Sequence, residues 1–212
     1  MMRTSWLGAM LTVVAFVGLD LALTGRHRLT PVFMTPAIGL ILIASLAIAR
    51  FARNPALVRA GRFATIGFVV VAASLNAINL VVVVDDVLFH STDISPISLV
   101  LTSLALWAAN VLAFSLLYWS LDGGGPDVRA SDAPGYPDFN FPAYADPSLV
   151  RPGWRPTFID YLFIGFTTST AFGPVEAMPL TPRAKGLMIL QSVISLVTLI
   201  VVAARAVGVI PG

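Results

Sequence analysis

Polar side chains recur at helical spacing near the carboxyl end of the chain, within a long apolar segment. Gln191, Ser195 and Thr198 are separated by four and then three residues, so they share one face of a helix, and Arg205 falls on the same face. In a helix surrounded by lipid, such a stripe must face protein or water. The stripe therefore either lines a water-filled cavity or forms hydrogen bonds between helices.

A second polar set is acidic and lies in the first half of the chain. Asp86, His90 and Asp93 follow Asp85 at helical spacing, and carboxylate and imidazole groups can bind a divalent cation or relay protons. The sequence offers no second cluster to complete a coordination shell, so the alternative is a solvated helix end. We therefore expect no metal site.

Asn76 and Asn79 lie one turn apart in another apolar run, and two roles are open to them. Their amides can line a permeation path or form hydrogen bonds to a neighbouring helix. The second role is the one we expect, because amide pairs of this kind commonly join helices within membranes.

Catalytic signatures are absent from the sequence. His27 and His90 lie far apart, the chain has no cysteine, and it has no nucleophile elbow, H-E-x-x-H pair or phosphate-binding loop. The formal net charge of +2 is too small for a nucleic-acid-binding surface. We therefore expect neither an enzyme nor a cofactor-dependent or nucleic-acid-binding protein.

The composition indicates whether these side chains belong to a soluble protein or to a membrane protein. Of 212 residues, 57% are hydrophobic and 11% charged, whereas soluble domains carry roughly 25% charged residues. A membrane protein is therefore predicted. Four runs have close to the roughly 20 mostly apolar residues that cross a bilayer as a helix. These runs are residues 6–23, 32–49, 63–84 and 97–119.

The composition changes abruptly at Asp122. Residues 122–156 contain seven prolines, five glycines and five aspartates, with aromatic residues between them. A loop of this length in a compact protein is usually functional or disordered. The interleaved aromatic residues predict a loop that packs on the membrane surface or on a neighbouring subunit.

The apolar stretch that follows, residues 157–172, is short for a membrane span. About sixteen helical residues reach roughly 24 Å, less than a hydrocarbon core of about 30 Å. Residues 184–210 are long enough to cross. A short helix, an irregular connection and a full helix together describe a re-entrant loop, whose backbone must line a cavity or be buried in protein.

This segment resembles the pore module of the potassium-channel superfamily. The family pattern is a pore helix ending T-x-T, a filter T-V-G-Y-G-D and an x-x-P-x-T-P that begins the inner helix. This chain reads Thr168-Ser169-Thr170, Ala171-Phe172-Gly173-Pro174-Val175-Glu176 and Ala177-Met178-Pro179-Leu180-Thr181-Pro182. The resemblance covers residues 160–207. It implies a homotetramer that passes monovalent cations.

Within that module the resemblance assigns two groups of residues. The filter-like group is Thr168, Thr170, Ala171, Phe172, Gly173, Pro174, Val175 and Glu176. If four copies surround an axis, the cavity-lining group is Gln191, Ser195 and Thr198. Glu176 would form a ring of carboxylates that concentrates cations, or would be an ordinary loop acid.

The filter departs from the family where selectivity is decided. Only Gly173 matches a family glycine; Val175 occupies the second glycine position and Pro174 the tyrosine position. Neither valine nor proline readily adopts positive φ. A wider, weakly selective or non-conducting filter is therefore as plausible as one selective for potassium.

The distribution of basic residues conflicts with the orientation of that family. With a re-entrant short helix, ten basic residues lie on the filter face and three on the other. The positive-inside rule makes the ten-residue face cytoplasmic, whereas a potassium channel opens its filter outward. If residues 157–172 cross instead, the division is nine against four and the conflict disappears, at the cost of a thinned bilayer.

We therefore predict an all-α, polytopic protein of the cell inner (plasma) membrane. Residues 1–121 form a four-helix transmembrane scaffold, 122–156 a loop, and 157–212 a re-entrant half-helix, a filter-like loop and an inner helix. The alternative topology is six full crossings. The leading hypothesis is a homotetrameric cation channel, and the alternative is a non-conducting scaffold or accessory subunit that binds a partner through residues 122–156.

Overall fold

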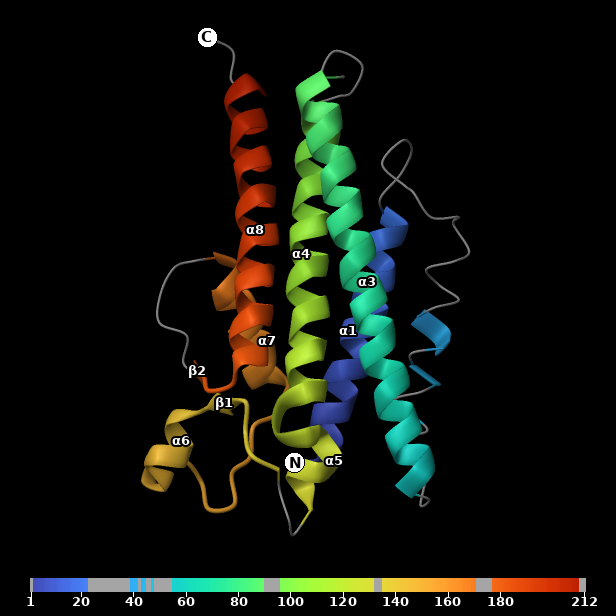
Figure 1. Cartoon of the computed structure of the whole chain (residues 1–212). Helices are drawn as coiled ribbons and strands as arrows, with labels where there is room; N and C mark the ends of the chain where they lie inside the picture. The colour runs from blue at the N-terminus through green and yellow to red at the C-terminus, as the bar shows by residue number, and fades with distance from the viewer. Residues whose placement is uncertain are drawn as a thin grey trace.

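Five helices dominate the computed structural model, which describes residues 2–22, 39–41, 43–44, 47, 55–89, 96–131, 135–170 and 177–209 (Figure 1). Four are long and one is short. They are α1 (Met2–Ala22), α3 (Pro55–Phe89), α4 (Pro96–Leu121), α7 (Phe158–Thr170) and α8 (Pro182–Val209). Within these residues the prediction of a mainly helical protein is confirmed.

Small elements fill the interval between α4 and α7. Proline begins three of them, as its fixed φ and missing N–H favour the first turn of a helix. The elements are η2 (Asp122–Gly124), α5 (Pro126–Ala130), β1 (Phe139–Asn140), α6 (Pro142–Ala145) and η3 (Pro147–Leu149). The strand β2 (Met178–Pro179) follows α7 and pairs antiparallel with β1. This two-stranded ladder was not predicted.

Three of the described helices are long and apolar enough to cross a membrane. The spans are Arg59–Asp85 in α3, Val100–Gly124 in α4 with the turn after it, and Pro182–Ala203 in α8. They support the prediction of a membrane protein. In α1 the apolar stretch Leu7–Leu19 is shorter. The predicted span over residues 32–49 lies mostly outside the described residues.

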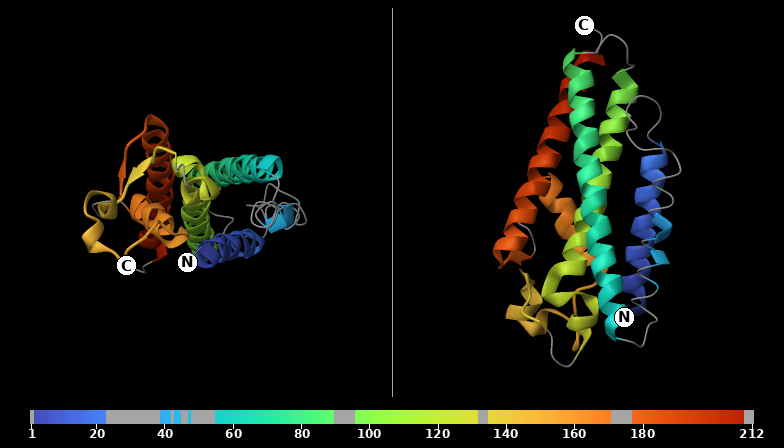
Figure 2. Two further views of the ribbon diagram at one scale, coloured as in Figure 1. Left: turned by 90° about the horizontal axis from the view of Figure 1, so that it is seen from below. Right: turned by 45° about the vertical axis from the view of Figure 1, so that its right-hand side comes forward.

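Helix α4 forms the centre of the bundle and contacts each of the other four helices (Figures 1 and 2). Accordingly 61% of its apolar span is buried, against 33% for α3 and 28% for α8. The outward faces of α3 and α8 expose large apolar side chains such as Val81, Val193 and Ile200. Lipid or another protein surface would cover these faces in a membrane.

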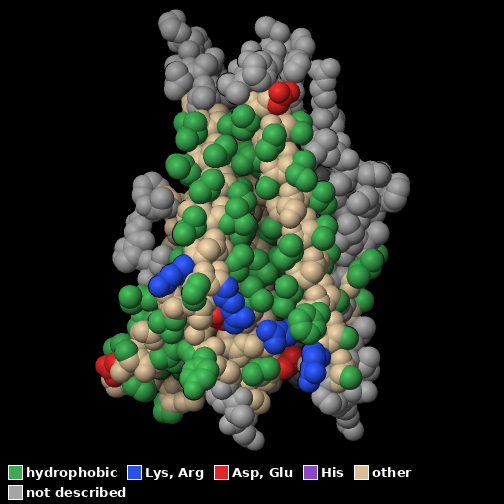
Figure 3. Space-filling view, in the orientation of Figure 1, with side chains coloured by type: hydrophobic (Ala, Val, Ile, Leu, Met, Phe, Trp, Pro, Cys, Tyr) green, Lys and Arg blue, Asp and Glu red, His purple; other side chains and the backbone are tan. Residues whose placement is uncertain are grey.

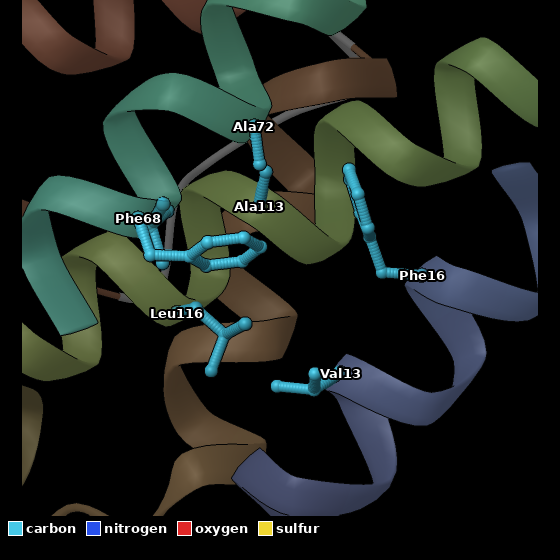
Figure 4. A pocket seen from close by; sticks show the side chains of 7 residues that line it. Val13, Phe16, Phe68, Ala72, Ala113 and Leu116 are labelled. Atoms are coloured by element: carbon cyan, nitrogen blue, oxygen red, sulfur yellow. The ribbon is translucent and has the colours of Figure 1, made fainter. Parts of the chain in front are cut away.

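Alanine allows α4 to approach α3 and α1 closely. Ala113 of α4 lies opposite Ala72 of α3, with Val13 and Phe16 of α1 beside them (Figure 4). The cavity between these side chains measures about 10 Å³ and has an apolar lining. Because an apolar cavity of this size provides no polar partners for water, we expect it to be dry.

The segment containing α7 begins and ends at the same end of the bundle. Phe158, the first residue of α7, packs edge-on against Trp119 at the end of α4, with the ring centroids 6.2 Å apart. After α7 the chain returns to β2, where Leu180 N donates to Asp138 O at 2.7 Å. At 13 residues, α7 is about 20 Å long and ends partway along α8 (Figure 1).

Gly165 places α7 directly against α4. A Cβ atom at this position would lie 2.2 Å from Ser115 Oγ and 3.1 Å from the carbonyl oxygen of Val111. Both obstacles belong to α4, and one of them is backbone. The short helix can pack at this depth only because residue 165 has no side chain.

We predict that Gly165→Ala separates α7 from α4 and lowers the free energy of unfolding by about 1–3 kcal/mol. The matched control is Gly186→Ala on α8, where a Cβ would meet nothing within 4 Å. There alanine should be neutral or stabilise by up to about 1 kcal/mol, because it favours the helix. Thermal unfolding in detergent, followed by tryptophan fluorescence, measures both. Equal midpoints for the two variants would contradict the packing described.

Candidate functional site

Gln191 joins α8 to both α4 and α7 through its side-chain amide. Its Nε2 donates to Gly165 O and to Ser169 Oγ, each at 2.8 Å, and its Oε1 accepts from the hydroxyl of Tyr118 at 2.5 Å. The side chain is 0% exposed. Both ends of the amide are therefore satisfied in the interior, where an unpaired polar group would be costly.

The polar face of α8 continues beyond Gln191 and packs against α4. Asn110 Nδ2 donates to Ser195 Oγ at 2.8 Å and to Gln191 O at 3.3 Å. Thr198 Oγ1 donates to Ile194 O of its own helix at 2.8 Å. The stripe therefore points into the helix bundle of one chain.

Gln191, Ser195 and Thr198 are 0%, 1% and 1% exposed in the single chain. Tyr118 and Asn110 on α4 complement Gln191 and Ser195, so these two side chains form the interhelical hydrogen bonds that were one of the two predicted alternatives. That the three residues line a cavity shared by four copies stays a prediction. The side chain of Arg205 lies outside the described residues.

The filter-like residues are described only at their amino-terminal end. Thr170 Oγ1 donates to the carbonyl oxygens of Phe166 and Thr167, both at 3.2 Å. Thr168 is 7% exposed, and its carbonyl oxygen accepts from Ser192 Oγ at 3.4 Å. Its own hydroxyl has no hydrogen-bond partner within the part of the chain that the structure describes. The remaining filter-like residues, Ala171, Phe172, Gly173, Pro174, Val175 and Glu176, lie outside the described residues.

The asparagines of α3 face the bundle interior. Asn76 Nδ2 donates to Leu106 O of α4 at 3.1 Å, which is the interhelical role expected of it. Asn79 is also buried, and its Oδ1 has no hydrogen-bond partner among the described residues. Asn76 therefore adds to the polar contacts along α4.

The acidic cluster predicted at the other end of α3 falls mostly outside the described part of the chain. Asp85 is exposed, while the side chains of Asp86, His90 and Asp93 are not described. Among the residues that the structure describes, no group of three or more His, Cys, Asp or Glu side chains could hold a metal ion.

Sequence reasoning missed a buried carboxylate that attaches the loop to the helices. Asp122 is 0% exposed and accepts hydrogen bonds from Asp138 N at 2.6 Å, Phe139 N at 3.2 Å and the Tyr161 hydroxyl at 2.5 Å. The Arg129 guanidinium lies 3.9 Å from the carboxylate and 5.0 Å from the centre of the Tyr161 ring. Asp122 thus joins the end of α4 to β1 and α7.

A second carboxylate attaches the same loop to α8. Asp138 accepts from Arg183 Nε at 2.6 Å and from Thr181 Oγ1 at 2.5 Å, and its other oxygen pairs with Arg183 Nη2 at 2.5 Å. Burial alone raises the pKa of Asp138, but the hydrogen bonds from Arg183 and Thr181 outweigh it, so this pKa lies below its ordinary value. Asp138 is therefore ionised at neutral pH.

Aromatic rings hold the loop together beneath the helices. Phe141 makes edge contacts with Tyr144, Trp154 and Tyr161 at centroid distances of 5.6–5.9 Å. Phe139 and Phe141 are almost fully buried. These rings pack within the chain itself, and a contact of the loop with a membrane surface or a neighbouring subunit stays a prediction.

The loop also forms a cavity of about 460 Å³ that opens to the surface. Its lining combines guanidinium groups with aromatic rings. The lining residues are Gly123, Arg129, Gly135, Pro137, Asn140, Tyr144, Trp154, Arg155 and Pro156. Arg155 Nη1 donates to Arg129 O at 2.6 Å, which fixes the two arginines relative to each other.

We predict that Gln191→Leu lowers the free energy of unfolding by about 2–4 kcal/mol, because it leaves Tyr118 and Ser169 without their buried partner. The control is Ser192→Ala, which removes one long hydrogen bond and should cost less than about 1 kcal/mol. Chemical unfolding in detergent measures the two costs. A Gln191→Leu protein as stable as Ser192→Ala would show that the amide does not hold the helices together.

Comparison with known proteins adds no relative. No protein-family model matches the chain, and neither a curated protein nor a solved structure matches it significantly. The resemblance to the potassium-channel pore module therefore stays a prediction made from residues 160–207 alone.

Proposed function

We propose that this chain is a multi-pass protein of the cell inner membrane that contributes a re-entrant half-helix, α7, to a cation pathway. In this proposal α1, the segment over residues 32–49, α3 and α4 form a scaffold, and α8 is the inner helix. One chain supplies one half-helix, so several copies, four by analogy with the family it resembles, surround the pathway.

The proposal rests on the path of the chain before and after α7. A helix of 13 residues enters from one end of the bundle, and the chain is back at that end when β2 pairs with β1. The carboxyl end of α7 is left beside the middle of α8. A helix carboxyl end carries partial negative charge, which favours a cation next to it.

Charge distribution supports an orientation for this module. The described basic residues at the α7 end of the bundle are Arg59, Arg62, Arg129, Arg151, Arg155, Arg183 and Lys185, whereas Asp85 lies at the opposite end. The positive-inside rule places the basic end in the cytoplasm. The half-helix would then enter from the cytoplasmic side, opposite to that of a potassium channel.

The outward faces of α7 and α8 supply apolar surfaces for contacts between copies. Ile159, Phe163 and Phe166 of α7 are 44–64% exposed, and Leu196 and Ile200 of α8 are both 58% exposed. Because the polar face of α8 is internal, any cavity lined by α8 would be apolar. Apolar constrictions can gate a pore by losing their water.

The test is cation flux into liposomes that contain the purified full-length protein. We expect flux of monovalent cations above that of empty liposomes, and a several-fold lower flux for Glu176→Gln, which removes a carboxylate at the proposed pore mouth. The control is Asp146→Asn, which removes an exposed acid from the loop and should leave the flux unchanged. Flux equal to that of empty liposomes would refute the channel.

A non-conducting scaffold or accessory subunit is the second candidate. It is favoured by the 460 Å³ cavity of the loop, whose arginine and aromatic lining suits a polar or anionic group of a partner. The oligomeric state in detergent separates the two candidates. A four-fold assembly supports the pore, whereas a monomer without flux supports the scaffold.

A further inference from the structure

The cavity in the loop between α4 and α7 lies at the end of the bundle where α7 begins. Its described lining comes from η2, α5, β1, α6 and the segment that leads into α7. Figure 1 places α6 and β1 below the start of α8, and Figure 3 shows the described Lys and Arg side chains gathered below the apolar surface of the long helices. The cavity therefore opens at the polar end of the molecule, where a water-soluble ligand can reach it.

The described lining of this cavity contains two arginines and no acidic side chain. The side chain of Arg129 is only 9% exposed, and its guanidinium lies 3.9 Å from the carboxylate of Asp122. Arg155 is exposed, and among the described residues it forms no ion pair with a carboxylate. A guanidinium has five N–H donors, and Arg155 uses one of them to bind Arg129 O. Arg155 can therefore offer further donors to an anion.

Two aromatic rings form another part of the lining. The rings of Tyr144 and Trp154 meet edge-on, with their centroids 6.1 Å apart and their planes at 69°. The buried ring of Phe141 contacts both, at 5.9 Å and 5.8 Å. Tyr144 is nevertheless 43% exposed, and Trp154 is only partly buried. Both rings are thus held in place with part of their surface uncovered, and the planar ring of a ligand can stack on such a surface.

The amide of Asn140 and the size of the cavity narrow the choice of ligand further. Asn140 is partly buried, and its side chain presents a donor and an acceptor next to each other. An amide of this kind matches the hydrogen-bonding edge of a nucleobase. The volume of about 460 Å³ falls in the range of roughly 300–1,000 Å³ that is usual for small-molecule sites. A mononucleotide combines a planar base, a polar base edge and an anionic phosphate at this scale.

We propose that this cavity binds one mononucleotide. The base stacks on Tyr144 or Trp154, with the amide of Asn140 at its edge. Arg155 receives the phosphate, and Arg129 adds positive charge to the cavity. The rings alone would accept an uncharged nucleoside and the arginines alone an inorganic phosphate, so the combination selects the nucleotide. This ligand goes beyond the channel and scaffold functions, and the proposal holds whether or not the protein conducts ions.

The test is isothermal titration calorimetry of the full-length protein in detergent and phosphate-free buffer, with AMP, adenosine and inorganic phosphate as titrants. We expect AMP to bind roughly 10-fold more tightly than either of its parts. Arg155→Gln should weaken AMP binding about 10-fold and leave adenosine binding unchanged, because it removes donors to the phosphate. Tyr144→Leu should weaken AMP binding about 5-fold and leave phosphate binding unchanged, because it removes a stacking surface.

Each of these variants has a matched control in the same loop. Arg151→Gln removes an exposed cation, and Tyr136→Leu removes a ring that is 97% exposed. Neither residue belongs to the described lining of the cavity. The affinity for AMP should therefore stay at the wild-type value in both controls.

Three results would overturn the proposal. The first is that AMP, GMP, CMP and UMP all fail to bind at millimolar concentration. The second is that AMP binds no more tightly than inorganic phosphate or than adenosine, since the site would then not recognise the two parts together. The third is an equal loss of AMP affinity in Arg155→Gln and Arg151→Gln, which would reflect overall charge alone. If Tyr144→Leu fails to fold, Arg155→Gln, on an exposed side chain, still decides the outcome.

Discussion

The buried amide of Gln191 is the contact on which the arrangement of the helices depends. Two hydrogen bonds bind it to α7 and one to α4, and no water competes for them because the side chain is fully buried. Apolar packing cannot by itself fix how far a helix of 13 residues slides along its neighbours. A directional bond at Gly165 and Ser169 sets that depth, and the missing side chain of Gly165 allows the helix to come close enough to make it.

The two carboxylates at the end of the bundle complete this constraint. Asp122 fixes the loop to α7 through Tyr161, and Asp138 fixes it to α8 through Arg183 and Thr181. The chain is thus held at β1, before α7, and at β2, after it. As a result α7, the loop and α8 are joined into one unit, and any function of α7 depends on residues well outside Thr168–Glu176.

The sequence predicts the described long helices α1, α3, α4 and α8, since apolar runs of membrane-spanning length leave few alternatives. The shortness of α7 follows from the length of residues 157–172. The direction of the Gln191 stripe could not be predicted, because a polar face indicates a polar neighbour without saying whether it is water or Asn110. The role of Asp122 was not predicted. A negative charge at the carboxyl end of a helix interacts unfavourably with the helix dipole, so Asp122 at the end of α4 could have indicated that compensating partners lie nearby. Local patterns carry no information about Tyr161 or Arg183, which lie far away in sequence.

In the proposed topology the chain around α7 enters and leaves the membrane on one side. The chain has no cysteine, so single cysteines introduced by Ser148→Cys, Leu180→Cys and Asp85→Cys can be labelled in sealed vesicles with an impermeant maleimide. If α7 is re-entrant, the first two react from the same side of the membrane and the third only from the other. Reaction of the residue-148 and residue-180 cysteines from opposite sides would show that α7 crosses the bilayer and is not re-entrant.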